Sequence, residues 1–173
     1  TSPQLDQLGP SYDRVIHLTN APRISTGAVN KTLAFEDMEE RYSASSTPVI
    51  TVDNFLRPEA LHALRKFCLE STIYFSCRNN NFVKTNISNG FNCDLLYQIA
   101  GELQQHFPTV LGNHYLSNIW TYRYNNQTEG VAPHTDKGAV TFNFWITPDD
   151  ANLVPEGGGL CIYPKEQPPE WDW

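Results

Sequence analysis

The sequence lacks long apolar runs, clusters of basic residues and CxxC pairs. No stretch has the roughly eighteen apolar residues of a membrane-spanning helix, so we expect no membrane contact. The 12 basic residues are scattered among 19 acidic ones, for a net charge of −7, which argues against a nucleic-acid partner. The four cysteines favour buried, reduced thiols, with disulfides as the alternative. With no visible signal peptide, they predict an intracellular, cytoplasmic protein.

The remaining composition is that of a folded chain of one domain. Its 173 residues contain 40% hydrophobic and 18% charged residues, enough for a core without disulfides. Prolines punctuate residues 1–47, which predicts an irregular lead-in with one short helix at 35–42. The β-branched segment 48–52 predicts a strand.

Two amphipathic helices are predicted next. One begins at Pro58, because proline suits the first helical position, and has apolar residues at helical spacing. The other has Asn92 as a candidate N-cap and ends at Pro108. Alternating or aromatic segments then predict strands at 119–124, 139–146 and 160–163, the last including Cys161. Helices followed by strands predict an α+β fold.

The segment with the clearest chemistry is His134-Thr135-Asp136. On an extended chain, residues i and i+2 point to the same side, which brings an imidazole and a carboxylate together. One nitrogen and one charged oxygen suit a divalent first-row metal and make two thirds of a facial triad of two histidines and one carboxylate. The alternative is a surface loop with a local hydrogen bond between His134 and Asp136.

The neighbouring motifs extend this pattern. Tyr124 ends an aromatic segment ten residues before His134, the alternating segment 140–146 (VTFNFWI) follows Asp136, and 158–164 (GGLCIYP) comes last. In this order the chain resembles the Fe(II)/2-oxoglutarate-dependent dioxygenase superfamily, and most of all its prolyl-hydroxylase-like branch. The run 143–153 (NFWITPDDANL) is also similar to a bacterial group of oxygenases of this kind.

The resemblance implies a double-stranded β-helix, which is a jelly-roll or cupin-like barrel, with the N-terminal helices supporting it. Residues 48–173 would form the N-terminal and central part of this domain. His134 and Asp136 would bind Fe(II), and Tyr124 would hydrogen-bond the co-substrate 2-oxoglutarate. Tyr122 would line the pocket, and Asn143 and Trp145 are weaker pocket candidates; core packing is the alternative for these side chains.

The implied activity is hydroxylation of a protein or small-molecule substrate, coupled to conversion of 2-oxoglutarate to succinate. The family completes its metal site with a second histidine and then a basic residue, yet no histidine or arginine follows Asp136 here. We therefore expect either a catalytically inactive fragment of a longer oxygenase or a shortened relative that serves as a non-catalytic binding module. We also expect weak metal binding, and self-association through the exposed sheet edges of an unfinished barrel.

Overall fold

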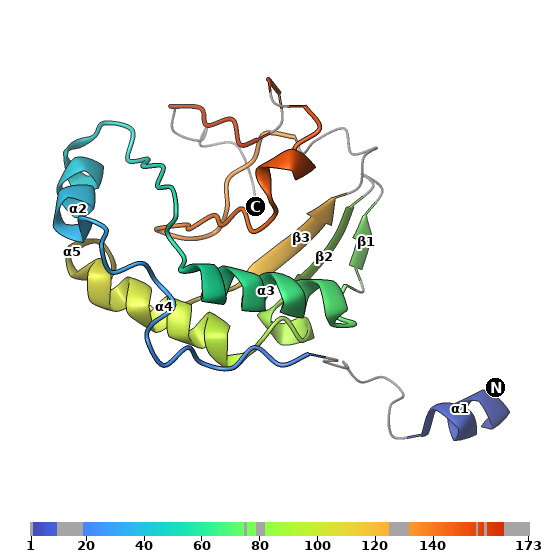
Figure 1. Cartoon of the computed structure of the whole chain (residues 1–173). Coiled ribbons are helices and arrows are strands. Elements are labelled where there is room, and N and C mark those ends of the chain that lie inside the picture. The colour runs from blue at the N-terminus through green and yellow to red at the C-terminus, as the bar shows by residue number, and fades with distance from the viewer. Residues whose placement is uncertain are drawn as a thin grey trace.

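A computed structural model describes residues 2–9, 19–74, 76–78, 82–124, 132–154, 156–157 and 159–164. Figure 1 shows the arrangement of its elements. The helices are α1 (Ser2–Leu8), α2 (Phe35–Ala44), α3 (Pro58–Glu70), α4 (Asp94–His106) and α5 (Pro108–Leu111), with 3-10 turns η2 (Ile87–Asn89) and η3 (Asp149–Ala151). The strands are β1 (Ser76–Arg78), β2 (Phe82–Asn86) and β3 (Trp120–Tyr124). Within these residues, no helix has both the length and the hydropathy needed to cross a bilayer.

The helices predicted from apolar spacing are present. Helix α3 has proline in its first turn, as predicted, and buries Leu64, Phe67 and Cys68. Helix α4 begins two residues after Asn92, with Cys93 in the cap position, and buries Leu95 among other apolar residues. The side chain of Asn92 instead donates a hydrogen bond to the carbonyl of Ile87 (3.2 Å). The short helix predicted at 35–42 is α2, which is two residues longer at its end.

The three described strands form one antiparallel sheet in the order β1-β2-β3. One face of the sheet packs against α3. On this face Thr85 is buried, and the hydroxyl of Thr121 lies 3.4 Å from the hydroxyl of Tyr74. The thiol of Cys68 in α3 interacts with both of these hydroxyl groups. Since side chains alternate along a strand, the other face points away from α3. Figure 1 shows the described residues between 132 and 164, in orange and red, above α3 in this view.

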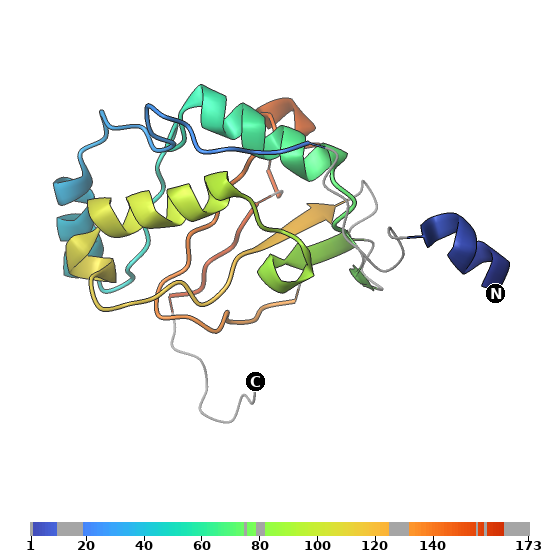
Figure 2. The same cartoon turned by 90° about the horizontal axis from the view of Figure 1, so that it is seen from below.

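The core lies between α3, α4 and the segment that precedes α2. Phe67, Ile73, Leu95 and Val29 are its largest fully buried side chains. In Figure 2, seen from below, α4 runs beside the blue segment that carries Val29. Residues 19–34 thus enter the core of the predicted 48–173 domain, although they belong to the predicted lead-in. Because these residues form no helix or strand, their apolar side chains have no regular spacing from which the sequence could predict their place in the core.

Polar side chains of α4 hold this segment in place. Gln98 brackets Ile24, because its amide accepts from Ile24 N (2.7 Å) and donates to Ile24 O (2.8 Å). The carboxylate of Glu102 accepts from Ala28 N (2.9 Å) and Val29 N (2.7 Å). Backbone groups that would otherwise be buried without partners are therefore satisfied by one helix face.

Three predicted strands are wrong within the described residues. Residues 48–52, 139–146 and 160–163 have no ladder partner there, so they are not strands. The alternation of 139–146 still governs packing, since Val140, Phe142 and Ile146 pack against the core. Conversely, β1 and β2 are absent from the strands predicted from the sequence. The double-stranded β-helix stays a prediction.

Two of the cysteines are buried thiols. Cys68 and Cys93 are free and buried, whereas Cys161 is free but exposed, so its predicted place in a buried strand is wrong. Burial raises the pKa of the Cys68 thiol to about 11 and also raises that of Cys93. Both groups are therefore neutral at physiological pH and act as small apolar side chains.

Candidate functional site

His134 and Asp136 lie side by side, as their spacing predicts. The Nε2 atom of His134 is 3.7 Å from Oδ1 of Asp136. The two side chains are 57% and 36% exposed, so the pair is open to solvent. This distance is too long for a hydrogen bond. The nitrogen and the oxygen are therefore both available to bind a metal ion placed between them.

The backbone fixes the orientation of the His134 ring. Its Nδ1 atom lies 2.8 Å from the carbonyl oxygen of Ala132. A carbonyl oxygen can only accept, so Nδ1 carries the hydrogen, and in the neutral ring Nε2 keeps its lone pair. That lone pair is on the side of Asp136. A histidine that donates its second ring N–H to a carbonyl is the usual arrangement at metal sites.

The geometry of the pair fits two ligands of one metal ion. Ligand atoms bound at ~2.1 Å and at right angles lie ~3 Å apart, and at tetrahedral angles ~3.4 Å apart. The observed 3.7 Å exceeds the tetrahedral value by about 0.3 Å and the right-angle value by about 0.7 Å, a difference that rotation of the exposed Asp136 side chain can close. In the part of the chain that the structure describes, no third histidine, cysteine or acidic residue joins them. The described residues therefore offer two ligands, which would hold a metal weakly.

The two tyrosines predicted for the pocket lie together on the sheet face that points away from α3. Tyr122 and Tyr124 have ring centroids 6.0 Å apart, and Phe82 of β2 lies 5.5 Å from each. Tyr122 is 38% exposed and Tyr124 is 52% exposed. The three rings therefore form a small aromatic wall that solvent and ligands can reach.

Tyr124 is suited to donate a hydrogen bond. Partial burial raises the pKa of its hydroxyl above the ordinary value of 10.0, because burial disfavours the charged phenolate. The group therefore keeps its proton at physiological pH. No hydrogen bond or ion pair joins Tyr124 to His134 or Asp136 in the described residues, so these residues form two separate groups of side chains.

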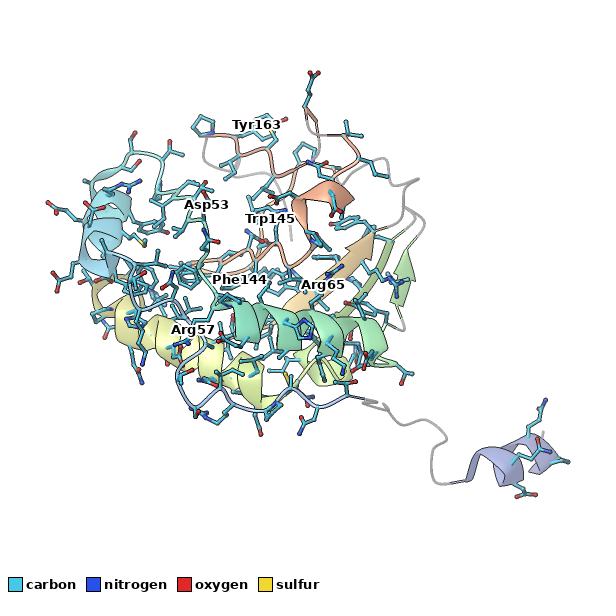
Figure 3. The ribbon with its side chains drawn as sticks, viewed as in Figure 1. Asp53, Arg57, Arg65, Phe144, Trp145 and Tyr163 are labelled. Atoms are coloured by element: carbon cyan, nitrogen blue, oxygen red, sulfur yellow. The ribbon has the colours of Figure 1, made fainter. Side chains whose placement is uncertain are left out.

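The role of Asn143 and Trp145 as pocket residues stays a prediction. Both are exposed, Trp145 to 63%, and neither lies on a strand. Figure 3 labels Trp145 beside Phe144, which packs its ring against Phe55 at 5.8 Å. Asn143 and Trp145 alternate with the residues that face the core and so point to the solvent side.

Sequence reasoning missed two members of the tyrosine-bearing face. Phe82 and Lys84 lie on β2, opposite Tyr124 and Tyr122 in the strand register. Residues 82–86 (FVKTN) show no alternation of apolar and polar side chains, so the sequence has no clear strand signal here. A strand of such mixed polarity is recognised only when its partner strand is known.

Comparisons with protein-family models, curated proteins and solved structures give no match to this chain. The resemblance to oxygenases therefore depends on the motif residues of the sequence alone.

Proposed function

We propose that this chain carries part of the metal and co-substrate site of an Fe(II)- and 2-oxoglutarate-dependent oxygenase. The observation that supports the proposal most is the pair of His134 and Asp136, whose donor atoms lie 3.7 Å apart with the imidazole oriented by Ala132. The open tyrosine-bearing face adds to it. An intracellular location and a protein or small-molecule substrate belong to the same proposal.

Each residue has a distinct role in this proposal. His134 supplies the neutral nitrogen ligand, and Asp136 supplies the charged oxygen that offsets part of the charge of the cation. The iron, when bound, would supply the activation of O2 and of the C–H bond. The carbonyl of Ala132 holds the ring of His134, and the hydroxyl of Tyr124 would donate a hydrogen bond to an oxygen of the 2-oxo acid.

Binding of Mn(II), a stable substitute for Fe(II), tests the metal pair. The signal of free Mn(II) in electron paramagnetic resonance falls when the ion binds, which gives its affinity directly. We expect weak binding by the parent chain, and a loss of about tenfold or more in Asp136→Asn and in His134→Gln, because each removes one of two ligands. Asp150→Asn, which removes an exposed carboxylate in η3, is the matched control and should bind like the parent.

Two results would count against the proposal. Equal affinity in the parent and Asp136→Asn would remove this carboxylate from the metal site. Submicromolar affinity in the parent would mean that a further ligand had been missed. In the protein as the cell makes it, release of succinate from 2-oxoglutarate should require Fe(II) and should be lost in Asp136→Asn but not in Asp150→Asn.

A second candidate is a non-catalytic binding module built on the same fold. The observation that favours it is the exposure of Tyr122 and Tyr124 on an open sheet face, which can bind a ligand without a metal. The succinate assay separates the two candidates. Turnover that depends on Asp136 supports the oxygenase, whereas ligand binding without any turnover supports the module.

A further inference from the structure

The register of β2 and β3 places one lysine at the centre of an aromatic surface. Directly opposed residues of antiparallel strands point to the same side, as do alternate residues of one strand. Lys84 is opposite Tyr122, and Phe82 is opposite Tyr124. The face of these two strands that points away from α3, here called the aromatic face, carries Phe82, Lys84, Asn86, Trp120, Tyr122 and Tyr124.

Lys84 is the one charged residue among these six positions. It is half-buried, and it has no acidic ion-pair partner within the described residues. Tyr122 faces it across the ladder, and two further aromatic residues lie on the diagonals. Lys84 therefore lies beside a row of three aromatic residues of β3 and is only partly exposed to water, a setting in which a charge-assisted hydrogen bond to an anion is stronger than in bulk solvent.

We infer that the aromatic face binds the carboxylate of a small organic acid, with Lys84 as the residue that recognises its charge. The ammonium group donates to the carboxylate, and the adjacent tyrosine rings contact the flat carbon part of the acid. The chain as a whole has a net charge of −7, and Lys84 gives the aromatic face a local positive charge that attracts a small anion.

The ligand of the aromatic face is a small organic acid, and the experiment decides between two sources of it. The acid is either the 2-oxo acid of the proposed function or another organic acid that needs no metal. Only the choice of the 2-oxo acid depends on the proposed function, because Lys84 lies on β2 and takes no part in the metal pair. Binding measured in the absence of metal therefore tests Lys84 separately from His134 and Asp136.

Titration calorimetry in the presence of EDTA can test this. The ligands are 2-oxoglutarate, benzoate and the neutral analogue benzamide, each added to the parent, Lys84→Met, Lys84→Arg and Lys66→Met. Lys66 is exposed on α3 and is the matched control for loss of one positive charge. We expect at least one acid to bind the parent, with affinity about tenfold or more lower in Lys84→Met, as for loss of a charge-assisted hydrogen bond.

The other variants make the result specific. Lys84→Arg keeps the charge and should bind within about threefold of the parent, and Lys66→Met should be unchanged. Benzamide should bind more weakly than benzoate. Preference for 2-oxoglutarate identifies the co-substrate as the source, and preference for benzoate identifies another acid. The inference is overturned if neither acid binds the parent at millimolar concentration, if Lys84→Met binds as well as the parent, or if benzamide equals benzoate.

Discussion

Replacing Glu102 by alanine should destabilise the chain strongly, because its carboxylate holds the backbone of Ala28 and Val29 on α4. Glu102 Oε2 accepts from Ala28 N (2.9 Å) and Val29 N (2.7 Å), and Oε1 accepts from the side chain of Gln98 (2.7 Å). Ala28 and Val29 are fully buried. Each buried N–H left without an acceptor costs about 1–3 kcal/mol.

The expected loss of unfolding free energy comes from the two N–H groups of Ala28 and Val29. Their sum is about 2–6 kcal/mol, and water can reach the half-buried site of Glu102, which favours the lower half of that range. Glu102→Gln keeps one acceptor oxygen and should lose about 1–2 kcal/mol. Urea unfolding measures both changes. Glu40→Ala, at an exposed position of α2, should change the free energy of unfolding by about 0.5 kcal/mol or less.

The same residue should make stability depend on pH. Desolvation raises the pKa of Glu102, but hydrogen bonds from Val29, Gln98 and Ala28 and the charge of Lys31 together lower it below 4.5. The stabilisation is therefore full above pH 4.5 and is lost as the pH falls through the lowered folded-state pKa. The gap in stability between the parent and Glu102→Gln should narrow below pH 4.5. A gap independent of pH, or a Glu102→Ala variant as stable as Glu40→Ala, would refute the reasoning.

Two further outcomes follow from buried groups. Glu39→Ala removes the acceptor of Thr109 N (2.8 Å) and Val110 N (2.9 Å) at the start of α5, and should lower the free energy of unfolding by about 1–2 kcal/mol. An unchanged urea midpoint would contradict this. Iodoacetamide at pH 8 should modify exposed Cys161 before Cys68, because burial shields Cys68 and raises its pKa to about 11. Peptide mass mapping checks the order, and faster reaction of Cys68 would contradict it.

The local part of the fold could be predicted from the sequence. Helices α3 and α4 follow from apolar residues at helical spacing and from prolines at a helix start and after a helix end, which act within a few residues. The proximity of His134 and Asp136 could be predicted for the same reason, since two residues of extended chain suffice to bring them together.

The non-local part could not be predicted. A strand exists only with a hydrogen-bonded partner, so segment 139–146 keeps its alternation without being a strand, whereas β2 is a strand despite its mixed polarity. Lys84 becomes notable only when the register places it opposite Tyr122. The contribution of residues 24–29 to the core likewise depends on Gln98 and Glu102, which lie more than seventy positions away in the sequence.

The contact between Ala132 and His134 has a consequence for how the protein tolerates mutation. Every amino acid supplies a peptide oxygen, and this oxygen does not titrate. The tautomer of the His134 imidazole therefore depends on the backbone conformation at residues 132–134 and not on the side chain of another residue. Pro133, which lies between the two, restricts that path. Substitutions of Ala132 should therefore leave the orientation of the imidazole unchanged, whereas replacing Pro133 should disturb it.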